Sequence, residues 1–223
     1  MSTSRLILWG GLLGLVIAGC TGSRTVSQTK KATKDTKETA SLDEIQQVAG
    51  SDHQPFLVRL ETSKGDVVIE VHPEWSPRGA KRFRELVEAG FYDECRFFRV
   101  LEGFMAQVGM NGDPEINGPW EKRQIRDDPV IQSNKRGFVT FATSGPDKRT
   151  TQFFINMADN STLDRRGFSP MGKVIEGQEF VEALYTGYKE EPLQPNISRR
   201  GNAYLKSEFP KLDYIVRATI EQP

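Results

Sequence analysis

The strongest constraint on the fold is a series of short apolar-rich segments, spread over residues 56–220 and separated by turn-forming residues, with apolar and polar residues alternating at 56–61 and 214–220. Alternation places one face of a strand against a core and leaves the other face in solvent. Turn-forming residues separate the segments, and the Ser-Lys-Gly-Asp sequence at 63–66 between two apolar runs predicts a β-hairpin. We expect strands at 56–60, 67–71, 96–100, 104–108, 137–142, 152–157, 171–175 and 213–220.

Only two segments have the periodicity of a helix. Ser76 and Pro77 supply an N-cap and a first helical residue, apolar residues at helical spacing follow, and Gly90 ends the segment. A second helix is expected at 177–188, followed by a long polar loop. Many strands and two helices indicate a mainly β protein. A closed antiparallel barrel fits because closure removes exposed strand edges, although periodicity alone does not distinguish a barrel from a sandwich.

The N-terminus has the order of a secretion signal. Arg5 gives a basic start, an apolar run follows, and small residues precede Cys20. Residues 17–20, Ile-Ala-Gly-Cys, resemble a bacterial lipobox, in which the cysteine is lipidated and becomes the first residue of the mature protein. We therefore expect a signal peptide at 1–19 and a lipid anchor at Cys20 that holds the protein at the cell envelope, with its domain facing the periplasm or the exterior. An ordinary signal peptide or an uncleaved anchor is the alternative.

The segment that follows the cysteine is polar. Residues 20–51 are rich in Ser, Thr, Lys, Asp and Gln and cannot bury enough apolar surface to offset the entropy of ordering. We expect a flexible tether there, with a possible short helix at 42–48. The remaining residues, 52–223, suit one folded domain, and a monomer is the default expectation.

Composition excludes several classes of function. The 30 basic and 30 acidic residues balance, so charge gives no reason to expect a nucleic-acid partner. The only histidines are His53 and His72, which leaves little for a triad hydrolase or a zinc site, and no phosphate-binding glycine motif occurs. We expect neither a metal nor a cofactor. If Cys20 carries lipid, Cys95 is unpaired and is a small buried apolar residue.

One stretch has an unusual composition. Residues 97–107 place one arginine, Arg99, and one glutamine, Gln107, among large apolar side chains. Strand alternation puts Arg99 on the opposite face from Phe98. From the residues alone, an arginine in such surroundings is most often a surface residue whose aliphatic stem packs on its neighbours.

Several ordered motifs resemble those of one family. Residues 92–109 resemble the cyclophilin signature, residues 137–146 followed by 152–155 resemble the second block of that family at the same spacing, and residues 163–164 and 172–174 resemble the third. The sequence is thus similar to cyclophilins from about residue 56 to residue 220. The resemblance implies an eight-stranded antiparallel barrel capped by two helices. It also implies peptidyl-prolyl cis/trans isomerisation of proline-containing polypeptides, here exported proteins whose folding it would assist.

The resemblance also implies roles for individual residues. Arg99 falls on the catalytic arginine of the family, and Phe98 and residues 167–170 depart from the family by lacking a usual histidine. A non-catalytic chaperone that binds proline peptides on the same fold is the alternative, and the retained arginine favours the enzyme. The other matched positions are the proline pocket, Phe104, Met105, Phe154 and Leu163, and the groove that holds the substrate backbone, Gln107, Ala142, Thr143 and Gln152.

Overall fold

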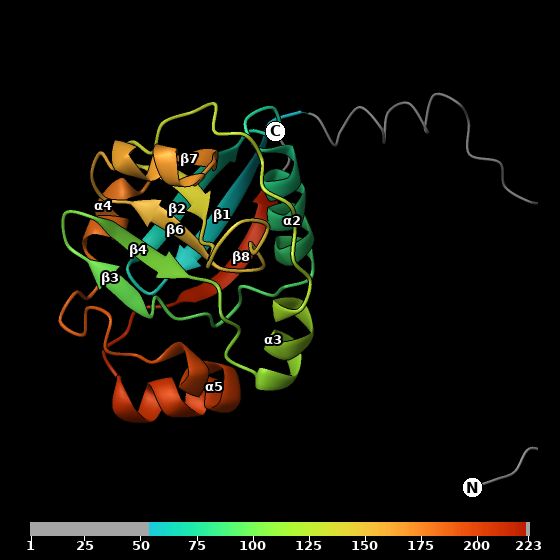
Figure 1. The fold of residues 1–223 in the computed structure, drawn as a ribbon. Helices are drawn as coiled ribbons and strands as arrows, with labels where there is room; N and C mark the ends of the chain where they lie inside the picture. Colours follow the sequence, from blue (N-terminus) through green and yellow to red (C-terminus); the bar gives the residue numbers. More distant parts are fainter. Residues whose placement is uncertain (1–53, 222–223) are drawn as a thin grey trace, which may run out of the picture. The chain divides into compact units, whose positions relative to one another are not determined.

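The computed structural model describes residues 54–221, and they form a mainly β domain (Figure 1). All eight expected strands are present and pair in one antiparallel sheet, in the order β3-β4-β6-β5-β7-β2-β1-β8. Strands that are far apart in the sequence are neighbours in the sheet, and β1 pairs with β8. The strands are β1 (Phe56–Thr62), β2 (Gly65–Val71), β3 (Arg99–Leu101), β4 (Met105–Val108), β5 (Phe138–Phe141), β6 (Phe153–Asn156), β7 (Pro170–Glu176) and β8 (Ile215–Glu221).

The sheet is a curled half-barrel, and the expected closed barrel is wrong. The two end strands, β3 and β8, form no ladder with each other. Between the segments that precede them there is an isolated bridge, Arg96 to Tyr214, beside which the Phe97 amide donates to the Asp213 carbonyl at 2.9 Å. Strand β3 has only three residues, and its Val100 amide donates to Lys189 O instead of β8. A short strand with another partner cannot complete the ladder.

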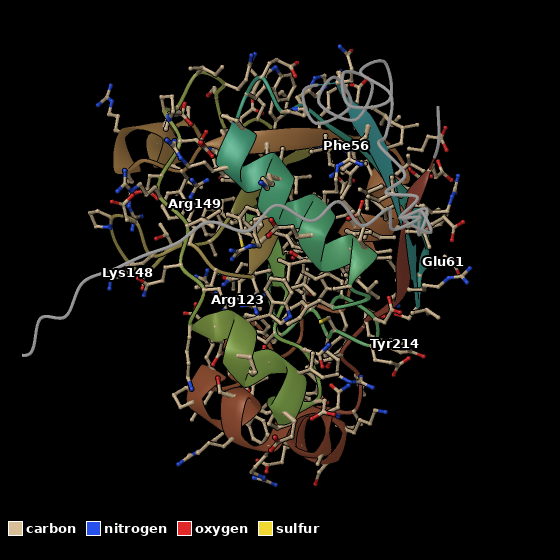
Figure 2. All side chains as sticks on the ribbon, turned by 90° about the vertical axis from the view of Figure 1, so that its right-hand side faces the viewer. Phe56, Glu61, Arg123, Lys148, Arg149 and Tyr214 are labelled. Carbon is tan, nitrogen blue, oxygen red and sulfur yellow. The ribbon has the colours of Figure 1, made fainter. Side chains whose placement is uncertain are left out.

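The core lies between the concave face of the sheet and helix α2 (Pro77–Glu88), which packs against β7 and β8. Phe83 of α2 is fully buried and meets Phe153 edge to face, with ring centroids 5.2 Å apart. Cys95 is also fully buried, as expected, and burial raises the pKa of its thiol well above the usual range. Figure 2 views the α2 side of the domain, with α3 and α5 beyond the end of the helix.

The N-terminus of α2 is capped differently from the expectation. Ser76 occupies the N-cap position, but its side chain makes no capping bond. Its hydroxyl donates instead to Oδ2 of Asp128 at 2.6 Å, and the Gly79 amide donates to the same oxygen at 2.9 Å. A buried carboxylate accepts several donors at once and complements the positive end of the helix dipole. The cap therefore comes from a distant loop.

The expected second helix is much shorter than predicted. Helix α4 (Gln178–Glu182) has only five residues. Beyond its end, the Tyr185 amide donates to the Asp213 side chain at 2.7 Å and not to a carbonyl of the helix. The expectation of two helices is wrong, since the described residues also contain α3 (Pro114–Glu121), α5 (Gln194–Glu208) and the 3-10 helix η1 (Ser161–Arg166).

Helices α3 and α5 pack against each other, and α5 lies in the segment expected to be a long polar loop. α5 bends at Gly201, whose φ is +52°. A Cβ there would lie 1.9 Å from Gly112 O, so only glycine allows this approach. A second apolar cluster lies beneath α5 and contains Phe98, Met110, Ile197, Tyr204, Leu205 and Leu212.

Several expectations concern residues outside the described range. These are the signal peptide at 1–19, lipidation of Cys20, the tether at 20–51 with its possible helix at 42–48, and His53. Among residues 54–221, no helix has the length and hydropathy needed to cross a membrane.

Candidate active site

Strand register brings the candidate residues into one row. Arg99 on β3 lies opposite Gln107 on β4, and Gln107 lies opposite Phe154 on β6. Residues directly opposite each other project from the same face of a sheet. Met105, two residues before Gln107, shares that face. The row therefore places a guanidinium, an amide and an aromatic ring side by side over three strands.

These side chains line a hollow of about 320 Å³. Eight of the nine expected catalytic and substrate-binding residues line it, and Gln152 lines an adjoining hollow of about 200 Å³ that shares Gln107, Ala142 and Thr143. The structure adds three residues to which the sequence had assigned no role. The complete lining of the larger hollow is Arg99, Phe104, Met105, Gln107, Ala142, Thr143, Phe154, Leu163, Arg166, Phe168 and Gln194.

The apolar side of the hollow is a small separate cluster. Met105, Phe154 and Leu163 are 2%, 4% and 5% exposed and pack on one another. Phe168 packs on this cluster, edge to face with Phe154 at a centroid distance of 5.8 Å. Phe168 forms part of the wall and leaves the hollow open. The cluster offers an apolar surface of the kind that a prolyl ring contacts.

Arg99 lies at the polar side of the hollow. Its Nε donates to Oε2 of Glu190 at 2.9 Å, and its Nη1 donates to Oε1 of Gln107 at 3.3 Å. Its guanidinium carbon lies 5.9 Å from the centre of the Phe104 ring, and its side chain is 30% exposed. Arginine carries more donors than these contacts use, so N–H groups remain for a ligand.

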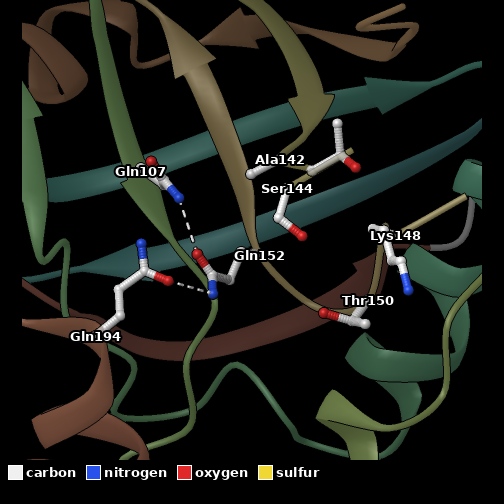
Figure 3. Close-up of a pocket in the computed structure, with 8 residues that line it drawn as sticks. Gln107, Ala142, Ser144, Lys148, Thr150, Gln152 and Gln194 are labelled. Carbon is white, nitrogen blue, oxygen red and sulfur yellow. Dashed lines mark hydrogen bonds between the residues drawn. The ribbon is translucent and has the colours of Figure 1, made fainter. Parts of the chain in front are cut away.

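A chain of amides continues from Arg99. Gln107 Nε2 donates to Gln152 Oε1 at 2.8 Å, and Gln152 Nε2 donates to Gln194 Oε1 at 3.1 Å (Figure 3). Arginine can only donate, so Gln107 must present its oxygen to Arg99 and its nitrogen to Gln152. The arginine therefore determines the direction of every bond in the chain.

A half-buried polar network supports the apolar wall from behind. Asp164 accepts from the Ser133 hydroxyl at 2.6 Å and from the amide and side chain of Asn134 at 2.9 and 2.8 Å. Burial alone would raise the pKa of Asp164, but these hydrogen bonds outweigh it and lower the pKa. Asn134 also donates to Phe168 O at 2.8 Å. The network thus fixes Phe168 and η1, which carries Leu163.

Sequence reasoning missed Arg166, Gln194 and Glu190 as neighbours of the site. Phe168 belongs to the 167–170 stretch, which the family resemblance had placed at the border of the pocket. Glu190 and Gln194 belong to a segment without periodicity or motif, and Glu190 is 91 residues from Arg99 in sequence. Only the tertiary structure reveals this contact.

A model of the family described as cyclophilin type peptidyl-prolyl cis-trans isomerase matches residues 57–201. The chain belongs to this family. It is 37% identical over 152 residues to peptidyl-prolyl cis-trans isomerase-like 3 of Rhizopus delemar, a match that spans 61% of this chain and 88% of that protein. The chain is therefore a peptidyl-prolyl cis-trans isomerase of cyclophilin type, as the resemblance implied.

Solved structures support the fold. The crystal structure of a Cryptosporidium parvum cyclophilin type peptidyl-prolyl cis-trans isomerase matches with a TM-score of 0.57 and 23% identity, over 76% of this chain and 99% of that chain. A crystal structure of the same protein in the presence of the dipeptide Ala-Pro matches with a TM-score of 0.55 and 23% identity, over 75% and 99%.

Proposed function

We propose that this cyclophilin isomerises X-Pro bonds with Arg99 as the catalytic residue, while Phe104, Met105, Phe154 and Leu163 hold the prolyl ring. Gln107, Ala142, Thr143 and Gln152 line the groove for the substrate backbone. The observation that carries the proposal is a single hollow with apolar side chains on one side and the Arg99 guanidinium on the other.

The mechanism follows from the chemistry of the peptide bond. Resonance gives a rotation barrier of about 18–20 kcal/mol, whereas the two X-Pro isomers differ by only about 0.5–1 kcal/mol. When the bond is twisted, the prolyl nitrogen becomes pyramidal and regains a lone pair that accepts a hydrogen bond. Arg99 is always charged and donates to that lone pair, which the planar ground state lacks. The stabilisation is therefore specific to the transition state.

The direct test removes the guanidinium. We expect Arg99→Ala to lower kcat by about a hundredfold, equivalent to about 3 kcal/mol, because one charged donor to the transition state is lost. The full-length chain is assayed on an Ala-Pro peptide. Arg217→Ala is the control, because Arg217 also lies on an end strand and pairs with a carboxylate, Glu61, away from the hollow. Equal turnover of Arg99→Ala and the parent would refute the assignment.

We also propose that the isomerase acts on exported proteins from the cell envelope, held there as a monomer by a lipid on Cys20. The order of basic, apolar and small residues before Cys20 supports this proposal. Expression of the full chain with a radiolabelled fatty acid tests it. We expect label in the parent and none in Cys20→Ser, and an unlabelled parent would refute the lipid anchor.

A further inference from the structure

The segment between α4 and α5 meets the edge of the sheet next to Arg99. The Val100 amide on β3 donates to Lys189 O at 3.1 Å. Lys189 has a φ of +48°, a left-handed conformation that is uncommon for a residue with a side chain. This turn of the backbone places Glu190 beside Arg99, the residue that precedes Val100.

Residues 189–194, here called the strap, bond to Arg99 and to Gln152, which lie on either side of Gln107 in the polar chain of the groove. Glu190 accepts from Arg99 Nε at 2.9 Å, and Gln194 accepts from Gln152 Nε2 at 3.1 Å. The strap is itself held, since Pro192 is buried and the Leu193 amide donates to the Tyr204 hydroxyl at 3.2 Å. Figure 3 shows Gln194 reaching Gln152 from the start of α5.

We propose that Glu190 is a positioning residue that orients the guanidinium of Arg99, an inference that rests on the proposed catalytic role of Arg99. A bond to Nε fixes the rotation of the planar guanidinium about its long side chain. With Nε held by Glu190 and Nη1 held by Gln107, the plane is set by two points. The remaining N–H groups then keep a constant direction toward the hollow.

The exposure of the pair separates this role from a structural one. The side chains of Arg99 and Glu190 are 30% and 62% exposed, and exposed ion pairs contribute little to folding stability. Removal of Glu190 should therefore leave the urea midpoint unchanged. Its effect should fall on kcat, because orientation matters for the transition state, while KM depends on apolar contacts that remain.

The experiment measures kcat and KM separately for the full-length chain on an Ala-Pro peptide. We expect Glu190→Ala to lower kcat by about tenfold with KM unchanged, because a misoriented donor loses part of its effect. Glu190→Gln keeps an acceptor of similar shape without the charge and should restore part of the loss. Glu191→Ala is the matched control, since Glu191 is the next residue and is exposed. It should behave like the parent.

The Arg99→Ala background separates the two possible failures. If Glu190 acts through Arg99, adding Glu190→Ala to Arg99→Ala should change kcat no further. If Arg99→Ala loses activity and Glu190→Ala does not, the positioning role is refuted and the catalytic role stands. A higher kcat for Glu190→Ala would also overturn the proposal, because the ion pair with Glu190 would then keep Arg99 from contacting the substrate. If Arg99→Ala is as active as the parent, the proposed catalytic role of Arg99 is refuted, and the positioning role of Glu190, which rests on it, is refuted with it.

Discussion

Asp128 links the helix cap of α2 to a buried arginine, and its removal gives the largest stability change that we predict. Its side chain is fully buried and accepts from Ser76, the Gly79 amide and Arg149 Nη2, the last at 3.0 Å. Arg149, labelled in Figure 2, is itself only 2% exposed. Asp128→Ala would leave a buried guanidinium with one partner fewer and a helix N-terminus without its cap.

The magnitude follows from these contacts. Breaking a buried ion pair by removing one partner costs about 3–5 kcal/mol. In the variant, Nε of Arg149 still lies 3.2 Å from Oδ1 of a second carboxylate, Asp127. We therefore expect a loss of stability at the lower end of this range, about 3 kcal/mol. Urea unfolding of the full-length chain at pH 7 measures the difference. The control is Asp113→Ala, because Asp113 caps α3 from an exposed position and its loss should cost about 1 kcal/mol.

The pH dependence gives a second readout. Burial by itself would raise the pKa of Asp128, but the hydrogen bonds from Ser76 and Gly79 and the charge of Arg149 outweigh burial and lower the pKa. A carboxyl whose pKa is lower in the folded state stabilises the protein above its unfolded pKa, and this stabilisation disappears as pH falls through the folded pKa. The difference between parent and Asp128→Ala should therefore narrow in acid. An effect at pH 7 no larger than that of Asp113→Ala would refute the buried-pair argument.

Two further substitutions test the groove and its surroundings. Phe168→Ala should raise KM by about tenfold with kcat unchanged, because the lost aromatic contact serves ground state and transition state alike, and steady-state kinetics on the Ala-Pro peptide measures it. An unchanged KM would exclude Phe168 from the binding wall. Gly201→Ala should destabilise the domain by about 1–3 kcal/mol, since a side chain at this positive φ meets Gly112 O, and urea unfolding measures it. A midpoint equal to that of the parent would show that α5 adapts without strain.

The sequence predicted most of what depends on local pattern. Apolar-rich segments between turn residues located every strand of the sheet, and motif spacing located the residues that strand pairing brings together, such as Arg99 and Gln107. Contacts between distant segments had no such signal. Ser76 is of a residue type favoured at the N-cap, yet the side chain that caps the helix belongs to Asp128, 52 residues away. No periodicity indicates that a buried carboxylate in a loop will compete for the same amides.

The missed helices have a similar explanation. Asp113 and Pro114 are a recognisable helix start, but the segment that follows contains Pro119, a residue that disfavours a helix interior. α5 depends on Gly201, which admits Gly112 so closely that the two helices pack. Closure of the barrel failed as an expectation because it assumed that β3 and β8 would satisfy each other, whereas Lys189 O takes the β3 amide.

The pairing of β1 with β8 has a consequence for how the domain is made. Arg59 and Glu221 bond across these strands although 162 positions separate them, so one edge of β1 stays unpaired until β8 has been synthesised. Pairing over such separations is slow, and an unfilled strand edge recruits other chains in the meantime. A nascent chain that stops before β8 should therefore aggregate, which would make an isomerase itself dependent on folding assistance until β8 is available for pairing.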